Sequence, residues 1–381
     1  MAVLLGLAGC GAPDSRSTAP PTATSTAAST ASASGSVSSR PTSPAPSSTR
    51  PTSPAPGPSA SPRPTSPRVA PSTTSVASVV AGHSAWVSVS VATLWRSPSS
   101  PRAVDQQALT APAGVRGWLG AMTLTDRRGL VDRADTQALL GDRVVVTSVQ
   151  GSWVKVVVPD QPTPLDARGY PGWVPSRQLS ATAPATATSV ATVTARTAWL
   201  RADNAGAAPT TEVSFGTRLP VLTGAGGDWV RVGLPGCLTR RLARSSVAVH
   251  AAGSAARPAT GLLLVQSAQA FTGLPYLWAG RSGFGFDCSG LTSLVYRVHG
   301  VTIPRDADAQ MAAGRAVSSA GRGPGDLLFY ATSSGYIHHV SMDAGAGLMV
   351  QSPATGKTVE TIPVSTASYA AQYAGARRFL G

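Results

Sequence analysis

One boundary in the sequence limits where this chain can fold. From Gly11 to Gly82 there is no aromatic residue and no glutamate, and most positions are Ser, Thr, Ala or Pro. Such a segment holds too little apolar surface to offset the entropy lost on ordering, so we expect it to be disordered. About 300 residues remain downstream of it, which is enough for two or three domains.

The N-terminus has the features of a short export signal. Residues 1–9 are mostly apolar, and the Leu-Ala-Gly-Cys run that ends at Cys10 resembles the lipobox of bacterial lipoproteins. In that motif the chain is cut before the cysteine and the thiol is acylated. The positively charged start typical of secretory signals is absent. The resemblance implies a signal peptide over residues 1–9, a membrane anchor on Cys10 and a linker over residues 10–82.

The linker is expected to act as a spacer. Residues 40–46 and 50–56 have the same sequence, Arg-Pro-Thr-Ser-Pro-Ala-Pro. Proline at this density favours polyproline II, which rises ~3.1 Å per residue. A lipid anchor at one end would then place the folded domains outside the cytoplasm, at the outer face of the membrane and reaching into the cell wall.

The charge of the chain has two interpretations. The sequence carries 31 basic and 17 acidic residues, a formal charge of +14. Basic proteins often bind anionic partners such as a membrane or a wall polymer. A GC-rich genome would also give this composition, because only Lys155 and Lys357 are lysines. No usual nucleic-acid-binding motif is visible, so we expect no nucleic-acid partner.

Two passages in the middle of the chain repeat one another. Residues 140–146 lead to a Gly-x-Trp turn at Trp153, and residues 215–221 lead to a similar turn at Trp229. Short strands separated by such turns are typical of a small β-barrel built from hairpins. The passages resemble bacterial SH3-like (SH3b) domains, which implies barrels over residues 83–180 and 192–252.

The two expected barrels differ at their ends. The first closes with Gly-Trp-Val at residues 172–174, and the second has Cys237 and an Arg-rich run there instead. The last strands of the second barrel are therefore left open. We favour core packing for Trp153 and Trp229 over contact with a wall ligand. With Cys10, Cys237 and Cys288 as its only cysteines, the chain is not a disulfide scaffold.

Cys288 lies where a helix is expected to begin. After Asp287 the apolar residues at 291, 294, 295 and 298 follow helical spacing, and a glycine at 300 is a natural stop. Unpaired N–H groups and the helix dipole stabilise a thiolate at such a position. The same N–H groups are suited to receive an oxyanion, and Asp287 is suited to cap the helix. Cys288 is thus either a buried, packed thiol or a nucleophile.

A thiolate nucleophile needs a base, and two adjacent histidines are candidates. Residues 337–342 alternate as a strand and residues 348–352 form the next one. A hairpin symmetric about Gly345 places His339 directly opposite Gln351, close enough for the amide to orient the imidazole. His338 then lies on the other face with Val340, although a register slip of one residue would exchange the two histidines.

A Cys at a helix start, a His on a strand and a polar orienter make a papain-like arrangement. Five motifs in order resemble the NlpC/P60 family of peptidoglycan hydrolases. The motifs are Tyr276-Leu277-Trp278-Ala279-Gly280, Asp287-Cys288-Ser289-Gly290-Leu291, Ile303-Pro304-Arg305 with Gln310, Pro324-Gly325-Asp326-Leu327-Leu328-Phe329, and His339-Val340.

This resemblance implies an α+β chain with a papain-like catalytic domain over residues 253–381. It implies Cys288 as nucleophile, His339 as base and Gln351 as the third residue, and it places Tyr276, Asp287 and Ser289 in the substrate site. It implies no metal and no cofactor. The expected activity of this monomer is cleavage of peptidoglycan stem peptides between D-glutamate and the diamino acid.

Three alternatives remain open at this point. The same fold supports an N-acetylmuramoyl-L-alanine amidase or an acyl transferase. A wall-binding lipoprotein with a dead catalytic domain is a second alternative, which the presence of both Cys288 and His339 weakens. A metal hydrolase using His338, His339 and Asp343 is a third, and no further ligand set has zinc spacing.

Overall fold

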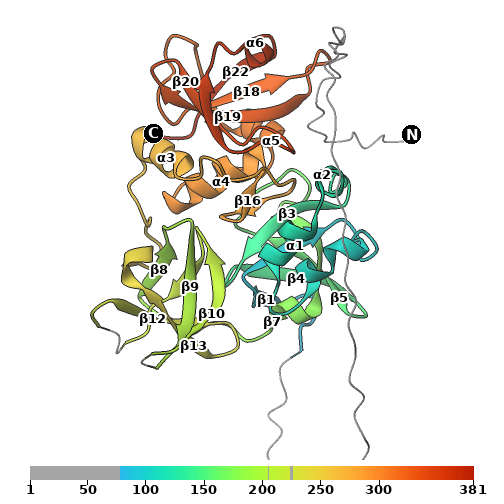
Figure 1. Ribbon diagram of the computed structural model, residues 1–381, viewed down its shortest axis with the longest axis vertical. Helices are drawn as coiled ribbons and strands as arrows, with labels where there is room; N and C mark the ends of the chain where they lie inside the picture. The colour runs from blue at the N-terminus through green and yellow to red at the C-terminus, as the bar shows by residue number, and fades with distance from the viewer. Residues whose placement is uncertain (1–77, 205, 224–225) are drawn as a thin grey trace, which may run out of the picture. The chain divides into compact units, whose positions relative to one another are not determined.

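The structure is a computed structural model that describes residues 78–204, 206–223 and 226–381. The expected signal peptide, Cys10 and nearly all of the expected linker lie outside the described residues. Figure 1 shows two β-rich modules followed by an α+β module at the C-terminal end. The predicted fold class, two small barrels followed by an α+β domain, is confirmed. No helix in the described ranges is long and apolar enough to cross a bilayer.

The first barrel is a seven-stranded antiparallel sheet in the order β3-β2-β6-β5-β4-β1-β7. Alternate residues of its strands fill the core, among them Val144 and Val146 from one strand and Val154 and Val156 from the next. This inward alternation is what a half-buried strand requires. The elements are β1 (Ser84–Val87), β2 (Val91–Trp95), β3 (Ala134–Leu139), β4 (Arg143–Gln150), β5 (Trp153–Val158), β6 (Tyr170–Pro175), η2 (Ser176–Gln178) and β7 (Leu179–Ser180).

A helical insert that the sequence did not predict lies between β2 and β3. It consists of η1 (Ala103–Leu109), α1 (Val115–Ala121) and α2 (Leu124–Arg128). Its indole at Trp118 donates to the Asp105 carboxylate at 2.9 Å and lies 6.2 Å from the Trp95 ring. Leu277 and Ala279 of the C-terminal module belong to the same apolar cluster, so the insert joins the first barrel to that module.

The second barrel consists of two small sheets, in the orders β10-β9-β13-β12 and β11-β8-β14. The Arg-rich run forms β13, which pairs with β12 and β9 and so supplies the strand that the sequence left open. Gly236 and Cys237 form its hairpin turn with φ of +78° and +59°. The elements are β8 (Ser189–Val193), β9 (Thr197–Ala202), β10 (Pro209–Ser214), β11 (Arg218–Pro220), β12 (Trp229–Leu234), β13 (Leu238–Ala243), η3 (Arg244–Ser246) and β14 (Val247–Ala251).

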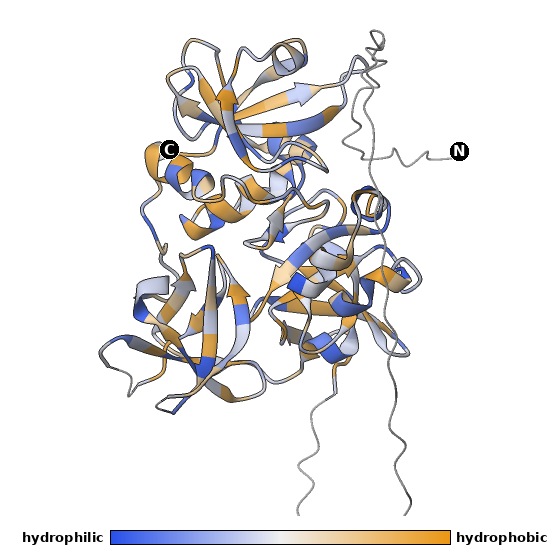
Figure 2. Ribbon diagram, in the orientation of Figure 1, coloured by the Kyte–Doolittle hydropathy of each residue, from blue (hydrophilic) through white to orange (hydrophobic). Residues whose placement is uncertain are grey.

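The C-terminal module packs its three longer helices on one face of a six-stranded antiparallel sheet, in the order β17-β22-β18-β19-β20-β21. The short last helix contributes Tyr369 to the apolar cluster of the other face. The central helix α4 is buried along its whole length and packs against β19. Figure 2 shows apolar stretches along this sheet. The elements are α3 (Gly261–Gln269), β15 (Arg281–Ser282), β16 (Gly285–Phe286), α4 (Cys288–Val298), α5 (Ala307–Ala313), β17 (Arg315–Val317), β18 (Leu327–Ala331), β19 (Ile337–Gly345), β20 (Leu348–Gln351), β21 (Glu360–Pro363), α6 (Ala367–Ala370) and β22 (Tyr373–Arg378).

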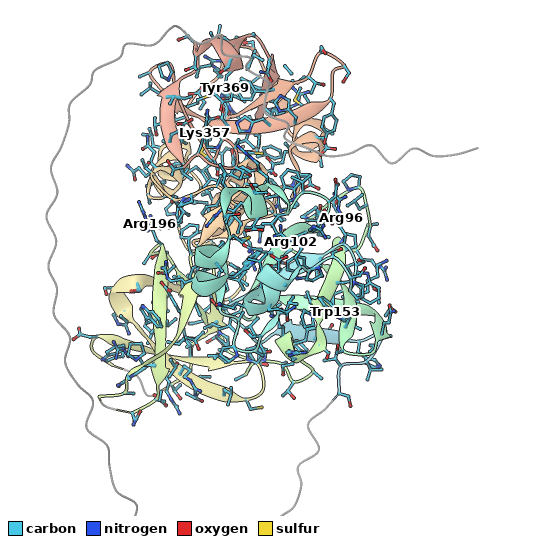
Figure 3. All side chains as sticks on the ribbon, turned by 45° about the vertical axis from the view of Figure 1, so that its right-hand side comes forward. Arg96, Arg102, Trp153, Arg196, Lys357 and Tyr369 are labelled. Atoms are coloured by element: carbon cyan, nitrogen blue, oxygen red, sulfur yellow. The ribbon has the colours of Figure 1, made fainter. Side chains whose placement is uncertain are left out.

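The core under α4 includes residues of both barrels. Leu139 of the first barrel and Phe215 of the second belong to the same buried cluster as Leu294 of α4. The Phe215 ring meets Phe271 edge to face at 5.2 Å, and Phe271 meets Phe286 at 4.8 Å. Arg196 of the second barrel, labelled in Figure 3, also donates to the Thr272 carbonyl at 3.0 Å. Residues of all three modules therefore meet in one apolar cluster, and each barrel also has a core of its own.

Candidate active site

Cys288 is the first residue of α4, where the sequence placed it. Asp287 is the N-cap, and its carboxylate accepts a hydrogen bond from the Gly290 backbone N–H at 2.6 Å. The Cys288 side chain is buried, with 4% of its surface exposed. Cys288 thus occupies a buried position in the first turn of α4, where the unpaired N–H groups and the helix dipole favour a thiolate.

Arg305 holds both residues that flank Cys288. Its guanidinium donates to Asp287 Oδ2 at 2.6 Å and to Ser289 Oγ at 2.9 Å. Burial lowers the pKa of Arg305, but the carboxylates of Asp287 and Asp306 raise it by more, so Arg305 stays charged. Burial raises the pKa of Asp287, and the Arg305 charge offsets part of that rise. The sequence offered Arg305 only as part of a motif, and its link to Asp287 and Ser289 was missed.

His339 and Gln351 lie side by side, as the hairpin predicted. His339 Nε2 donates to Gln351 Oε1 at 2.7 Å, and both side chains are buried. The Gln351 amide in turn donates to Glu360 at 2.9 Å, which fixes the amide with its oxygen toward the imidazole. Since Nε2 carries the proton of the neutral ring, Nδ1 is the nitrogen that can act as a base.

The predicted register of this hairpin is wrong by two residues. The strands pair Met342 with Val350, whereas symmetry about Gly345 would pair Met342 with Leu348. The turn lies at residues 346 and 347, which have φ of +50° and +75°, the conformation of a two-residue hairpin turn. Because the side chains of a strand alternate with a period of two, the even shift keeps His339 and Gln351 on one face.

His338 lies at a break in the β18–β19 register, where the predicted strict alternation does not hold. Tyr330 pairs with His339 and Ala331 with Ile337, which leaves His338 as the extra residue of a bulge. The rings of His338 and His339 are 6.4 Å apart, and His338 Nε2 lies 2.7 Å from Gln372 Oε1.

Burial has the largest influence on the pKa of His338. Burial lowers the pKa of His338, and so does the charge of His339. The Gln372 hydrogen bond and the charge of Cys288 raise this pKa by less, so the net shift is downward.

Three segments meet just before Cys288. Ser352, next to Gln351, donates to the Phe286 carbonyl at 2.8 Å. Tyr276, which is 2% exposed, forms a parallel bridge with Phe286. The structure thus brings the segments of Tyr276, Cys288 and Gln351 together. Within the described ranges, no three His, Cys, Asp or Glu side chains gather as a metal site would require.

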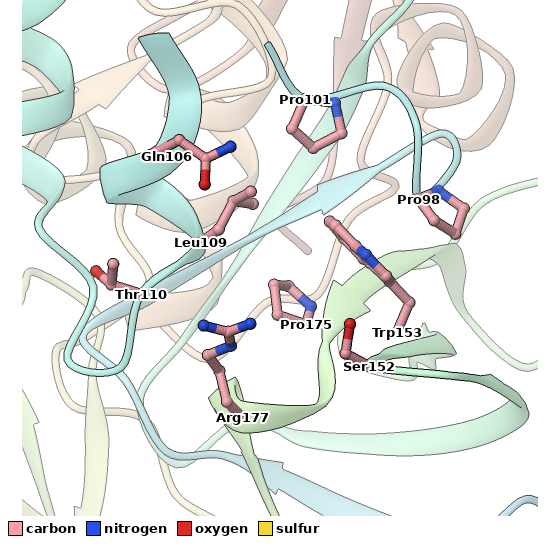
Figure 4. A pocket seen from close by; sticks show the side chains of 9 residues that line it. All are labelled: Pro98, Pro101, Gln106, Leu109, Thr110, Ser152, Trp153, Pro175 and Arg177. Atoms are coloured by element: carbon pink, nitrogen blue, oxygen red, sulfur yellow. The ribbon is translucent and has the colours of Figure 1, made fainter. Parts of the chain in front are cut away.

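The aromatic residues of the motifs and repeats occupy three different settings. The indole of Trp278, a residue of the first motif, donates to the Ala134 carbonyl of the first barrel at 2.9 Å. Trp229 lies between Arg201 and Arg241, whose guanidinium carbons are 5.7 and 4.6 Å from its ring centroid. Trp153 packs partly against the apolar cluster of the helical insert. It also lines a hollow of about 300 Å³ with Arg177, shown in Figure 4, which contains none of the expected site residues.

Comparison with known proteins identifies the family of this chain. The sequence profile of the NlpC/P60 family matches residues 273–378, and that of the YKFC SH3b2 domain matches residues 193–250. A gamma-D-glutamyl-L-lysine dipeptidyl-peptidase of Bacillus cereus is 41% identical over 303 residues, which span 78% of this chain and 91% of the relative. The chain belongs to the NlpC/P60 family.

A second relative and a crystal structure agree with this assignment. A gamma-D-glutamyl-L-lysine dipeptidyl-peptidase of Bacillus subtilis is 39% identical over 292 residues, covering 76% of this chain and 96% of the relative. The crystal structure of an NlpC/P60 family protein from Bacillus cereus is 40% identical with a TM-score of 0.74, and the match covers 78% of this chain and all of that one. The predicted NlpC/P60 and SH3b memberships are confirmed.

Proposed function

We propose that this NlpC/P60 protein is a cysteine peptidase that cleaves peptidoglycan stem peptides between D-glutamate and the diamino acid. The observation that carries the proposal is the His339–Gln351 pair, held on the module that sets Cys288 at a helix start. The enzyme class agrees with the two relatives, which are named for a gamma-D-glutamyl-L-lysine bond. Those names also favour this bond over the amidase and acyl-transferase alternatives.

The proposed reaction passes through an acyl-enzyme. His339 Nδ1 takes the Cys288 proton, and the thiolate attacks the carbonyl carbon of the D-glutamyl side chain. The N–H groups of the first turn of α4 stabilise the oxyanion. The imidazolium of His339 then protonates the leaving amine of the diamino acid, and water hydrolyses the thioester. Gln351 keeps the ring in the required tautomer throughout.

Three further residues are proposed as substrate contacts. Tyr276 lies next to the Phe286 strand that leads to Cys288, and Asp287 and Ser289 flank the cysteine. Arg305 pairs with both Asp287 and Ser289, so these side chains have fixed positions from which to bind a peptide.

The test is digestion of a synthetic L-Ala-γ-D-Glu-diamino acid peptide by the full chain, with mass spectrometry of the fragments. The proposal expects a dipeptide and a free diamino acid amine. A second reaction uses the same peptide attached to a muramoyl group, and release of the intact peptide from that group would favour the amidase. No cleavage of either substrate would favour a binding protein. His339→Ala is expected to abolish turnover, while His338→Ala retains it. Loss of turnover only in His338→Ala would reverse this assignment.

We also propose that Cys10 is lipidated and holds the enzyme at the outer face of the membrane. The support is the Leu-Ala-Gly-Cys run and the proline-rich segment that follows it. Expression of Cys10→Ser in a bacterial host tests this. The variant is expected in the soluble extracellular fraction, and its retention in the membrane fraction would contradict the proposal.

We further propose that the second barrel binds anionic wall polymers through four arginines. Arg201 and Arg241 flank the Trp229 ring, and Arg240 and Arg244 lie on the same strand or directly after it. These four arginines donate to backbone carbonyls, and none of them has a carboxylate hydrogen-bond partner among the described residues. Salt-sensitive binding to teichoic acid that falls in Arg240→Ala/Arg241→Ala is the expected result. Equal binding by the double variant would count against this surface.

A further inference from the structure

We propose that Thr136 of the first barrel is a positioning residue for Cys288, acting through Arg305. Thr136 lies in β3 and is fully buried. Its hydroxyl accepts a hydrogen bond from Arg305 Nε at 2.8 Å and donates to Gln161 Oε1 at 2.6 Å. The hydroxyl is therefore fixed in direction, with its lone pair toward Arg305.

Arg305 spans the boundary between the two modules. On one edge its Nε is held by Thr136, and its backbone N–H donates to the Pro162 carbonyl of the first barrel at 2.9 Å. On the other edge its two terminal nitrogens hold Asp287 and Ser289. Because a guanidinium is planar, fixing Nε also fixes the plane in which the terminal nitrogens meet the carboxylate.

The position of Asp287 determines where α4 begins. Its Oδ1 receives both Arg305 Nη1, at 3.1 Å, and the Gly290 N–H, at 2.6 Å. A rotation of the guanidinium would move this oxygen and the first turn with it, including Cys288. A misplacement of about 1 Å at a reacting centre can cost 10²-fold in rate. The hydroxyl of Thr136 is thus two hydrogen bonds away from the cap that sets Cys288.

The same strand of the barrel also supports the hairpin that precedes Cys288. Gln137 Oε1 accepts from the Arg281 backbone N–H at 3.0 Å and from Ser282 Oγ at 2.9 Å. Gln161 Nε2 donates to the Gln137 carbonyl at 2.8 Å, which links this contact to Thr136. One buried network in the first barrel therefore holds the chain on both sides of Cys288. The barrel forms part of the support of the site.

Two measurements test the role of Thr136, and only the first of them, peptide cleavage, rests on the proposed function. In the full chain, Thr136→Val keeps the shape of the side chain and removes the hydroxyl. We expect kcat/KM on the stem peptide to fall about tenfold, mainly through kcat, since a buried charged donor loses its acceptor. We also expect the rate–pH profile of Cys288 alkylation by iodoacetamide to move to higher pH. Thr136→Ser is expected to restore both readouts.

Thr192→Val is the matched control. Thr192 is also a buried barrel threonine, and its hydroxyl bonds His250 within the second barrel at 2.8 Å. It is expected to leave kcat/KM and the alkylation profile unchanged.

The possible results distinguish a failure of the positioning role of Thr136 from a failure of the proposed peptidase function. If Thr136→Val unfolds more easily but keeps the wild-type alkylation profile, Thr136 is merely structural and the inference is wrong. If the wild type cleaves no stem peptide, the proposed function fails, and the alkylation profile still tests the positioning role. If Thr136→Val does not fold, Gln161→Met removes the acceptor that orients the hydroxyl. We expect a smaller shift of the same sign from Gln161→Met, and no shift would overturn the inference.

Discussion

The two SH3-like barrels have the same repeat but meet the catalytic module in different ways. Their turns match closely: Gly141 and Gly216 have φ of +85° and +80°, and Gly151 and Gly227 have φ of +56° and +64°. These left-handed turns are ones that glycine adopts without strain. The repeated sequence therefore corresponds to a repeated backbone conformation at these turns.

The barrels differ in the side chains they present to the catalytic module. The first contributes buried polar groups, with Thr136 on Arg305 and Asp142 on Arg297. The second contributes the Phe215 ring and a hydroxyl, Ser214, that accepts from the Gly283 N–H. One barrel thus shares a charged network with the active site, and the other mainly shares its apolar core. Two barrels of the same fold therefore contact the catalytic module through different kinds of side chain.

The sharpest test of this difference is the loss of Asp142. Its carboxylate meets Arg297 at 2.6 Å, and both side chains are almost fully buried. Asp142→Asn should lower the free energy of unfolding by about 3 kcal/mol, because removing one partner leaves a buried charge without its main counter-ion. Urea unfolding followed by tryptophan fluorescence measures it.

Asp160→Asn is the control for that prediction. Asp160 contacts the same guanidinium at 2.9 Å, but its side chain is 54% exposed. We expect a loss of less than about 1 kcal/mol. Equal losses in the two variants would remove the distinction between buried and exposed contacts.

The helical insert of the first barrel should make stability depend on pH. Burial raises the pKa of Asp105, but hydrogen bonds from Arg102 and Trp118 lower it by more, so the net pKa lies below its usual range. A depressed folded pKa gives stability that is fully present above the ordinary aspartate pKa of about 4 and is lost as the pH falls through the folded value.

Asp105→Asn measures this contribution. At pH 7 the variant should be about 2 kcal/mol less stable, from the loss of charge-assisted hydrogen bonds. The gap to the wild type should narrow as urea midpoints are taken from pH 6 to pH 3. A gap that stays constant with pH would show that the Asp105 charge plays no part.

The smallest effect is expected between the two barrels. Arg116 of the first barrel pairs with Glu212 of the second at 2.5 Å, but the arginine side chain is 66% exposed. Arg116→Ala should cost less than about 1 kcal/mol, and the cost should shrink at high salt. Thermal unfolding at low and high salt checks this. A loss above 2 kcal/mol would mean that the barrels depend on each other more than on the catalytic module.

Sequence patterns within single elements correctly predicted those parts of the site that depend on one helix or one hairpin. The apolar spacing after Asp287 placed the start of α4, and strand alternation placed His339 and Gln351 on one face. Because side chains alternate with a period of two, the two-residue error in the register did not change which residues share a face with His339. It did fail at His338, because a bulge depends on the neighbouring strand and leaves no mark in its own sequence.

Long-range contacts were beyond the reach of the sequence. Thr136 and Arg305 are 169 positions apart, and nothing in either segment signals the other. The helical insert was missed because its short helices hold only a few apolar residues each, too few to show a period. The features that tie the modules together are thus the ones that only the folded chain reveals.

The most direct test of the account is the turnover of stem peptide by Cys288→Ala beside the wild type. Cys288 lies at the start of α4, and its proposed base is held by Gln351. The account predicts that kcat falls by at least about 10³-fold in a variant that unfolds at the same urea concentration as the wild type. Undiminished cleavage by Cys288→Ala would contradict the thiol mechanism.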